Sequence, residues 1–445
     1  MIEEKKIFAY ALKNAIEHKG KAQVNAVLNA LFHEGLKKEE VKNIINKIQE
    51  IIKQINSLSL QEQEKSFKEF EKGVSKREVR EGLPELLNAK QSKVIMRFAP
   101  FPSGPLHIGN ARTLILNDEY VKMYKGKLLL VIDDTIGSKE KQVLKEAYEL
   151  IKEGVELLGV KYHKLIKKSD RLKIYYSYAE KLIKKGKAYV CSCSVEQLRE
   201  NRKLMKECGC RQFPLKEQLK KWKKMFSKKT KEGELTLRIK TSMQDKNPAF
   251  RDRVLFRISD REHPLTKKKY RVWPLLDFSW AIDDYLLGIT HVLRGKDLMI
   301  ETEMEKYIFG LFSWKNPEFI HMGLLNFEDV KISKSKGQKE IKEGRYTGWN
   351  DPRTWSVQSL IKRGIQAEAL RKFLLSLGVK DNEITVPIDI LYAENRKILH
   401  EKAKQAKFQE TKKGKGYMQV IMPNGEFIEG KAVIEPKNIE GKAVI

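Results

Sequence analysis

Residues 94–110 read VIMRFAPFPSGPLHIGN, and this stretch decides how the middle of the chain folds. Val94 to Phe98 is an apolar run broken only by Arg97, which predicts a buried strand. The prolines and the glycine that follow predict a tight loop, and apolar residues then return at helical spacing over Leu106 to Met123. A second apolar run, Leu128 to Ile132, predicts another strand. Strand, loop, helix and strand in this order are typical of a doubly wound α/β domain with a parallel sheet.

The alternation of helices and strands continues on both sides of an insertion. A helix is expected at about Lys141–Leu158, a strand near Val160 and a helix near Tyr175–Lys185. After a strand at Ala188–Cys191 the rhythm breaks until Trp273. From there the pattern predicts a strand and a helix over Trp273–Gly295, a helix from about Glu301, a further strand, a loop rich in Gly, Lys and Ser near 337, and helices over roughly 352–405.

Both ends of the chain differ from this middle part. Residues 1 to about 75 place apolar residues such as Ile44 and Ile48 at helical spacing, so a helical domain is expected. The residues from 406 onward read as strands joined at Pro423-Asn424-Gly425, which favours a hairpin turn. The string IEGKAVI occurs at 428–434 and again at 439–445, and either paired barrel strands or a truncated or artefactual terminus accounts for the repeat.

The chain has 445 residues, which is enough for about three domains at roughly 150 residues each. With 41% apolar and 33% charged residues, its composition is that of a soluble globular protein. The boundaries above predict a helical domain at 1–88, a Rossmann-like α/β domain with halves at 89–190 and 271–337, an insertion at 191–270, a helical region at 338–405 and a short β segment at 406–445.

The chain is strongly basic, with 88 Lys and Arg against 59 Asp and Glu and a net charge of +29. Residues 161–240 hold 25 basic and 8 acidic residues, so more than half of the excess lies in less than a fifth of the chain. Such a field attracts a polyanion and favours nucleic acid as a partner. The start, Glu3 to Lys6, is charged where a secretory signal is apolar, and no apolar run is long enough to span a bilayer. We expect a cytoplasmic protein that does not enter a membrane.

All four cysteines are clustered, as the pairs Cys191-x-Cys193 and Cys208-x-Cys210. Two close pairs of thiolates separated by a loop are what a closed tetrahedral zinc site needs, and four buried thiols are the plainer alternative. A disulfide framework is not expected in the cytoplasm. The spacing therefore predicts a structural zinc ion on these four residues.

Two segments are suited to bind phosphate. The first, Pro105 to Asn110, lies where a strand turns into a helix, and a helix amino terminus presents free N–H groups to anions. His107 and Asn110 can donate hydrogen bonds there, and Gly109 allows a nucleotide to approach closely. The second segment, Lys331-Ile332-Ser333-Lys334-Ser335-Lys336-Gly337, predicts a mobile cationic loop that stabilises charge on departing pyrophosphate. Taken singly, the first segment is explained equally well as an ordinary helix start, and the second is explained better as a solvated basic loop.

Taken together, the two segments resemble the two signatures of class I aminoacyl-tRNA synthetases. Further motifs resemble the glutamyl-tRNA synthetase family in its archaeal form: Arg97-Phe98-Ala99-Pro100, Asp133-Asp134-Thr135, Asp283-Asp284, Gly288 to Gly295, Gly348 to Arg353 and Leu391 to Lys397. The resemblance covers about residues 20–400. It implies an insertion that binds the acceptor end of tRNA, a helical stem-contact domain at 338–405 and the start of an anticodon-binding β-barrel, apparently truncated, at 406–445. It implies ATP-dependent ligation of L-glutamate to tRNA-Glu, with tRNA-Gln left open, by a monomer that uses ATP, Mg²⁺ and structural Zn²⁺.

The resemblance also implies roles for single residues. Catalysis is expected from His107, Asn110, Lys331 and Lys334. ATP is expected to contact Pro105, His107, Gly109, Asn110, Asp297, Lys331, Ser333, Lys334 and Ser335. The amino acid is expected to contact Arg97, Ala99, Ser103, Asp133, Leu276, Trp280 and Arg294. Arg97 and Arg294 would clamp substrate carboxylates, because a guanidinium group suits planar bidentate recognition; ordinary ion pairs are the alternative.

The sequence departs from the family pattern around the amino acid. Val131 stands where the family usually has arginine, and Ile136 and Gly137 stand where it has aspartate and proline. Leu276 replaces the usual pocket tyrosine, and Trp280 is the later pocket position. These departures leave open a non-catalytic tRNA-binding relative. The short C-terminus leaves open an enzyme that glutamylates another acceptor, such as a tRNA base.

Overall fold

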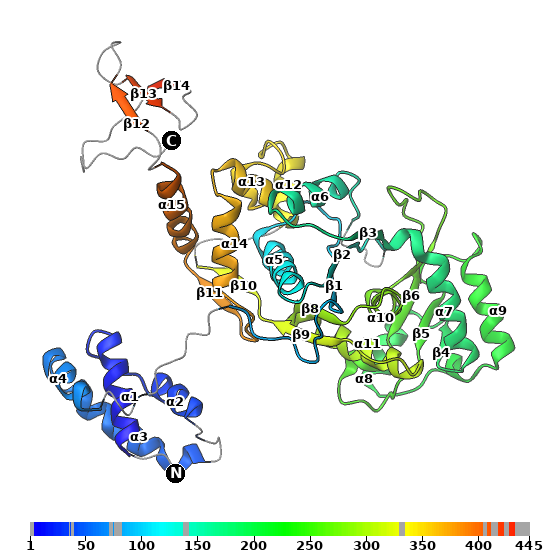
Figure 1. Cartoon of the computed structure of the whole chain (residues 1–445). Helices are drawn as coiled ribbons and strands as arrows, with labels where there is room; N and C mark the ends of the chain where they lie inside the picture. The colour runs from blue at the N-terminus through cyan, green and yellow to red at the C-terminus, as the bar shows by residue number, and fades with distance from the viewer. Residues whose placement is uncertain are drawn as a thin grey trace. The chain divides into compact units, whose positions relative to one another are not determined.

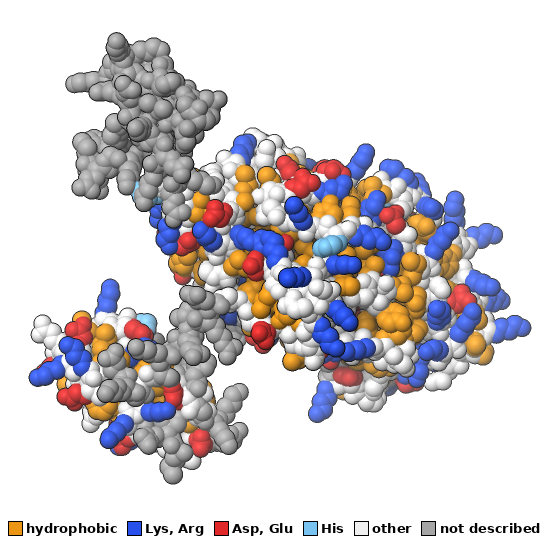
Figure 2. Space-filling model, viewed as in Figure 1, with side chains coloured by type: hydrophobic (Ala, Val, Ile, Leu, Met, Phe, Trp, Pro, Cys, Tyr) orange, Lys and Arg blue, Asp and Glu red, His pale blue; other side chains and the backbone are white. Residues whose placement is uncertain are grey.

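The chain forms two compact units, residues 1–81 and 82–445 (Figure 1). The computed structural model describes residues 4–34, 36, 40–70, 74, 82–136, 142–328, 334–403, 407–410, 417–421 and 427–431. Lys and Arg side chains are spread over the face shown in Figure 2, as the net charge of +29 requires. Among the described helices, none combines the length and the apolar character needed to cross a membrane.

The first unit is helical, as its apolar spacing predicts. It contains α1 (Glu4–Glu17), α2 (Val24–His33), α3 (Val41–Asn56) and α4 (Leu60–Phe70). Helix α1 contacts the other three, and its Leu12 packs in one core with Val27 and Ile48. The buried Gln63 side chain of α4 donates to the carbonyl oxygens of Ile55 at 2.8 Å and Gly20 at 3.0 Å. These bonds join α4 to the end of α3 and to the turn after α1.

The second unit is built on a parallel sheet, which confirms the predicted α/β class. The strand order is β3 (Lys164–Lys167), β2 (Lys127–Ile132), β1 (Ile95–Phe98), β8 (His291–Gly295) and β9 (Glu318–Met322). All four strand pairs are parallel. The chain runs outward from β1 in one direction and from β8 in the other. The carboxyl ends of β1 and β8 therefore flank the switch point, where sheets of this kind bind ligands.

Helices cover both faces of this sheet. On one face Met96 and Leu130 share a core with α5 (Ile108–Met123), α6 (Ala147–Leu157), α13 (Val357–Lys362) and α14 (Ala367–Ser376). On the other face Val131 is fully buried beside Leu129 and Val292. The helices α10 (Leu276–Leu286) and α11 (Met299–Leu311) share a further core with α7 (Leu172–Lys184).

The insertion forms an antiparallel sheet in the order β4 (Ala188–Cys191), β5 (Thr236–Ile239), β6 (Val254–Ile258) and β7 (Val272–Pro274). It carries α8 (Val195–Lys203) and α9 (Leu215–Met225), and Trp222 of α9 packs into the core. The strands at Ala188 and Trp273 were predicted as parts of the α/β alternation. Strand β4 instead pairs with β5, and β7 pairs with β6, both antiparallel. Strands β5 and β6 lie between β4 and β7 in the sequence and are therefore their nearest partners.

A strand near Val160 was a wrong prediction. Gly159 has a φ of +65° and ends α6, and the Val160 amide donates back to Val155 at 3.2 Å. Val160 is apolar because it packs in the core, and the strand begins later, at Lys164. The predicted loop near residue 337 is also helical in part, since α12 spans Lys334–Lys342.

The remaining elements complete the second unit. Strands β10 (Leu325–Phe327) and β11 (Ile384–Val386) pair in parallel, and α15 spans Asp389–Ala403. Strands β12 (Lys407–Glu410), β13 (Tyr417–Ile421) and β14 (Phe427–Lys431) form an antiparallel sheet, with Ile421 opposite Phe427 as in the predicted hairpin. The predicted turn residues and the second IEGKAVI copy lie outside the described residues. Short 3-10 helices lie at Lys168–Arg171, Gly209–Gln212, Pro248–Phe250, Lys296–Leu298 and Pro352–Thr354.

Candidate active site

The switch point of the parallel sheet brings together three residues predicted to contact the amino acid. Arg97 comes from β1, Arg294 from β8 and Trp280 from α10. The guanidinium carbons of Arg97 and Arg294 lie 4.8 and 4.6 Å from the centroid of the Trp280 ring. Both distances are typical of cation–π contacts. The predicted convergence of these positions is therefore realised in the fold.

Each of the two arginines is also held by a buried carboxylate. Asp284 of α10 accepts from Nε and Nη2 of Arg97, the second bond at 2.8 Å. Glu305 of α11 accepts from Nη1 and Nη2 of Arg294 at 2.7 and 3.1 Å. Burial raises the pKa of Glu305 to about 7, although the charge of Arg294 opposes the shift. Both arginines thus form ion pairs, and the Nε–H of Arg294 is left outside its pair with Glu305.

Asp133 faces a cation that the sequence did not suggest. Its Oδ2 accepts from Lys168 Nζ at 3.1 Å, and Lys168 also donates to Ser279 Oγ at 2.9 Å. Lys168 has no exposed surface, and its Nζ lies 5.0 Å from the Trp280 centroid. Burial lowers the pKa of Lys168, while the charge of Asp133 acts in the opposite direction. Three cations therefore surround Trp280, and each is paired with a carboxylate.

The phosphate-binding segment is organised by His107, which caps α5. The Nδ1 atom of His107 accepts from the backbone amides of Gly109 at 3.1 Å and Asn110 at 3.3 Å. An added Cβ at Gly109 would lie 3.0 Å from the His107 ring, so glycine makes room for this cap. Burial, and next the charge of Lys334, lowers the pKa of His107 to about 3. The imidazole is therefore neutral, and with Nδ1 accepting, its proton is on Nε2, where it can be donated.

The second signature segment begins helix α12 and lies near the first. Lys334 is close enough to His107 to lower its pKa, and the ring of Trp349 joins the two segments. An added Cβ on Gly104 would lie 3.0 Å from this ring, and one on Gly337 would lie 3.3 Å from it. The sequence predicted a mobile loop over these lysines. From Lys334 onward the backbone is helical instead, and Gly337 in the first turn is buried beside Trp349.

The other predicted contact residues lie mostly at the same end of the sheet. Ala99, Ser103 and Pro105 lie in the loop between β1 and α5, and Asp297 follows β8. Leu276 is the first residue of α10, and Ser335 is exposed in α12. Lys331 and Ser333 lie outside the described residues.

The four cysteines form a compact cluster. Their Sγ atoms all lie within 4.8 Å of one another, and those of Cys191 and Cys208 are 3.7 Å apart. A tetrahedron with Zn–S bonds of about 2.3 Å has edges of about 3.8 Å, so the arrangement fits zinc. A hydrogen bond from Cys191 lowers the pKa of Cys208 to about 5. The buried Arg238 lies 3.7 Å from Cys208 Sγ and 3.8 Å from Cys191 Sγ, where it offsets thiolate charge.

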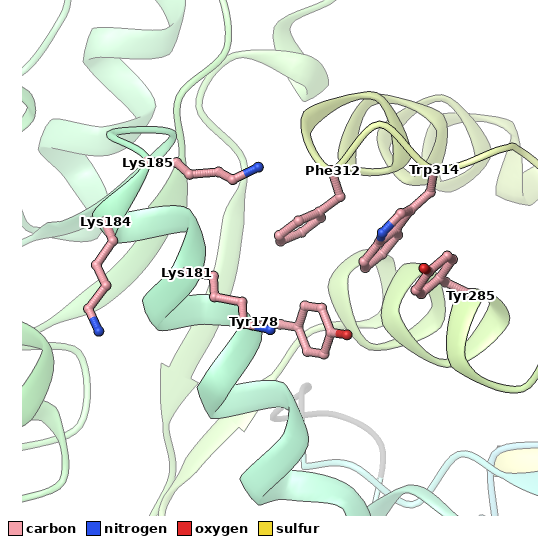
Figure 3. Close-up of a pocket in the computed structure, with 7 residues that line it drawn as sticks. All are labelled: Tyr178, Lys181, Lys184, Lys185, Tyr285, Phe312 and Trp314. Carbon is pink, nitrogen blue, oxygen red and sulfur yellow. The ribbon is translucent and has the colours of Figure 1, made fainter.

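A pocket of about 410 Å³ lies elsewhere on the surface (Figure 3). The ring of Trp314 stacks on Tyr285 at 3.8 Å and on Phe312 at 4.4 Å. Tyr285 lies in the last turn of α10, before β8, and Trp314 precedes β9, so the pocket lies at the amino ends of these strands. Its lining is Tyr178, Lys181, Lys184, Lys185, Tyr285, Phe312 and Trp314, and none of these residues was predicted as a site residue.

Sequence reasoning missed four residues of the candidate active site: Lys168, Asp284, Glu305 and Trp349. Asp284 was quoted as part of a motif but was given no role, and the structure pairs it with Arg97. Lys168 and Glu305 carry no local signal, because nothing in the sequence separates them from the many exposed lysines and glutamates. Trp349 was likewise part of a quoted motif, and only its contacts with two distant glycines reveal its place.

Comparison with known proteins agrees with this geometry. The model of the family "tRNA synthetases class I (E and Q), catalytic domain" matches residues 93–401. The glutamate–tRNA ligase of Methanocaldococcus jannaschii is 43% identical over 406 residues, which are 90% of this chain and 72% of that protein. The glutamate–tRNA ligase of Thermococcus kodakarensis is 44% identical over 400 residues, 88% of this chain and 70% of that protein.

A solved structure shares the fold. The crystal structure of a glutamate–tRNA synthetase from Elizabethkingia anophelis matches with a TM-score of 0.52 and 20% identity, over 69% of this chain and 71% of that one. At this identity the match concerns the fold alone. The family model and the archaeal relatives carry the assignment, and the chain belongs to the class I tRNA synthetases for glutamate and glutamine, among the glutamate–tRNA ligases.

Proposed function

We propose that this chain activates L-glutamate with ATP and transfers it to the terminal adenosine of tRNA-Glu. One observation carries the proposal: residues that we assign to the amino acid and to ATP lie at the same end of the parallel sheet. Arg97 and Arg294 lie around Trp280, and His107 caps the helix that starts beside them, within the field of Lys334. This placement supports an in-line reaction between a carboxylate and a triphosphate, because residues assigned to both substrates come from the same end of the sheet.

The first step joins glutamate to AMP. An oxygen of the glutamate α-carboxylate attacks the α-phosphorus of ATP, which is bound as its Mg²⁺ complex, and pyrophosphate leaves. His107 Nε2 and the Asn110 side-chain amide donate to phosphate oxygens, and Lys331 and Lys334 stabilise the charge on departing pyrophosphate. Because His107 is neutral, it acts as a hydrogen-bond donor in this step and does not transfer a proton.

The second step transfers glutamate from the adenylate to a ribose hydroxyl of tRNA, the 2′-hydroxyl in class I enzymes. No covalent intermediate with the chain is involved. Asp133 is assigned to the substrate amino group, which then shares this carboxylate with Lys168. Arg97 and Arg294 are assigned to the carboxylates. The chain contributes position and charge, and the reacting groups all belong to the substrates.

The remaining parts of the chain are assigned to tRNA. Residues 191–270 would bind the acceptor end, with a structural zinc on Cys191, Cys193, Cys208 and Cys210 and with Arg238 balancing its thiolates. The excess of 25 basic over 8 acidic residues at 161–240 supports a phosphate-binding face there. Residues 338–405 would contact the stem, and 406–445 would begin an anticodon-binding barrel. We assign a cytoplasmic monomer.

Glutamate-dependent ATP–pyrophosphate exchange, run with tRNA-Glu present, tests the proposal. Exchange with glutamate and charging of tRNA-Glu are expected, and separate charging of tRNA-Gln decides the second acceptor. A folded, zinc-loaded protein that shows no exchange would contradict the assignment. The pairing of all three pocket cations with carboxylates favours a second candidate, a tRNA-binding relative without activity. That candidate predicts salt-sensitive tRNA binding without adenylate formation.

A further inference from the structure

One histidine of the insertion reaches the end of the parallel sheet. The Nε2 atom of His263 lies 2.9 Å from the backbone carbonyl oxygen of Asp134, a residue 129 positions away in the sequence. Asp134 directly follows Asp133 after strand β2. His263 has no exposed surface, and its ring stacks on Trp273 of β7 at 5.3 Å. The insertion therefore touches the backbone beside the residue assigned to the substrate amino group.

The turn that carries His263 fixes the hydrogen-bond roles of its ring. Nδ1 accepts from the backbone amides of Leu265 at 3.2 Å and Thr266 at 3.1 Å. Burial lowers the pKa of His263, although the charge of Asp134 opposes the shift, so the ring is neutral at pH 7. With Nδ1 accepting, the proton is on Nε2, and it is donated to the carbonyl oxygen of Asp134.

A short path leads from this carbonyl group to the carboxylate of Asp133. The carbonyl belongs to the peptide that joins Asp134 to Thr135, and a peptide moves as one plane. Thr135 Oγ1 donates to Asp133 Oδ1 at 3.2 Å. The position of His263 is thus linked to the Asp133 carboxylate through one rigid peptide and one hydrogen bond.

The same turn presents basic residues to solvent. Two backbone bonds between His263 and Lys267, of 2.8 and 3.2 Å, close the turn. Lys267, Lys268 and Lys269 are all exposed. Adjacent ammonium groups beside the end of β2 suit the phosphates of an RNA strand whose terminal ribose must reach the adenylate. RNA bound there would act on the turn that His263 ties to Asp134.

We propose that His263 is a positioning residue through which RNA bound at the turn 263–269 sets the position of the Asp133 carboxylate. The inference rests on the proposed function, in that Asp133 is taken to hold the substrate amino group and the insertion to bind tRNA. His263 itself touches no substrate. Its effect is a coupling free energy: bound tRNA tightens glutamate binding, and glutamate tightens tRNA binding by the same factor.

Two substitutions separate the turn from its bond to Asp134. In His263→Asn the side-chain oxygen can still accept from the amides of the turn, as in an Asx turn, but the shorter side chain loses the donor to Asp134. In His263→Gln the longer side chain can bring an amide N–H toward the Asp134 carbonyl oxygen. The Gln variant is therefore expected to restore part of what the Asn variant loses.

The test measures binding of radiolabelled glutamate to the full chain by equilibrium dialysis, without tRNA and with saturating tRNA-Glu. In the wild type tRNA is expected to lower the dissociation constant of glutamate about fivefold or more. In His263→Asn this ratio should fall to within about twofold of one, while filter binding shows unchanged tRNA affinity. A purely structural role would weaken glutamate binding equally in both conditions, and that result overturns the inference.

A second comparison uses exposed positions, so it does not depend on the stability of the His263 variants. Replacing the three lysines of the turn with alanine should also reduce the ratio. The control replaces three exposed lysines of α9 in the same insertion, and at saturating tRNA it should keep the ratio; its positions are Lys216, Lys220 and Lys223. Equal ratios in the two triple variants overturn the inference.

ATP–pyrophosphate exchange on the same samples separates the inference from the proposed function. A wild type that exchanges with glutamate but shows a ratio of one overturns the inference and leaves the function in place. A ratio that depends on His263 without any exchange contradicts the function and supports the inference.

Discussion

Glu305 accepts from Nη1 of Arg294 at 2.7 Å and from Nη2 at 3.1 Å, so its carboxylate binds the Nη1/Nη2 edge of the guanidinium group and leaves Nε outside the pair. Two carboxylates would therefore share one arginine when glutamate is bound. Burial raises the pKa of Glu305 to about 7, and Asp284 also raises it, while Arg294 and Arg97 lower it. A substrate carboxylate adds another negative charge nearby, so the bound state favours protonated Glu305.

We predict that glutamate binding weakens as the pH rises from about 6 to 8. Below its pKa of about 7 the Glu305 carboxyl is neutral and does not repel the substrate; above it the carboxylate is charged and does. The KM for glutamate, measured by exchange across this range, should increase with pH. In Glu305→Gln the charge is absent, and this part of the pH dependence should disappear. A wild type and a variant with the same profile would refute the coupling.

His107 is expected to act in two separable ways. His107→Ala removes the acceptor that caps α5 and should lower the free energy of unfolding by about 1 kcal/mol. His107→Asn supplies a new cap and should restore most of this stability. Both variants lose the Nε2–H donor, so exchange should fall roughly 100-fold in each. Because the pKa of His107 is about 3, its protonation should not affect the rate between pH 5 and 8. Thermal unfolding and exchange rates would separate the two roles, and an active Asn variant would contradict the donor role.

Lys334→Ala should slow activation by roughly 100-fold, because the ammonium group stabilises the departing pyrophosphate. The affinity for tRNA should stay nearly the same, since one lysine of so many contributes little to phosphate contacts. Lys339→Ala, an exposed position of the same helix, is the control and should leave exchange intact. Exchange rates and filter-binding measurements of tRNA affinity provide the check. Equal losses of exchange and tRNA affinity in Lys334→Ala would argue against this role.

Lys168→Met should lower stability strongly, by about 3–5 kcal/mol, because it leaves the buried carboxylate of Asp133 without its cation. The double variant with Asp133→Asn should recover part of the loss. Lys152→Met removes a surface ion pair with Glu149, 2.8 Å long, and should cost less than about 1 kcal/mol. Calorimetry of the three variants measures these differences. If Lys168→Met and Lys152→Met lowered the free energy of unfolding by similar amounts, the buried ion pair would contribute no more to stability than the surface pair.

Cys208→Ser should abolish tight zinc binding and loosen the insertion. Three thiolates and a hydroxyl bind zinc much less well than four thiolates, and a structural zinc contributes directly to folding. Ser194→Ala, which removes a helix cap in the same insertion, is the control and should retain the metal. Metal content per chain and limited proteolysis across 191–270 provide the readouts. A variant with unchanged zinc would contradict the four-thiolate site.

Much of the backbone order of the α/β core could be predicted from the sequence, because strands such as β1 and β8 are short, mainly apolar runs that end near proline or glycine. The cysteine cluster could be predicted because its four members are close in the sequence. Val160 misled the prediction, since an apolar residue after a helix can pack in a core without forming a strand. The partners of Arg97 and Arg294 could not be predicted, because Asp284 and Glu305 are far from them in the sequence and become buried only when α10 and α11 bring them against β1 and β8.

The ring of Trp349 lies against Gly337, in the second segment assigned to ATP, and against Gly104, which directly precedes the first. If the backbone of one segment shifts toward the Trp349 ring, it therefore pushes the ring against the other segment. A side chain introduced at either glycine would displace the ring and so affect both of the segments that we assign to ATP, even though the two positions are far apart in the chain. For anyone who wishes to alter nucleotide preference in this enzyme, the three positions form a single design unit.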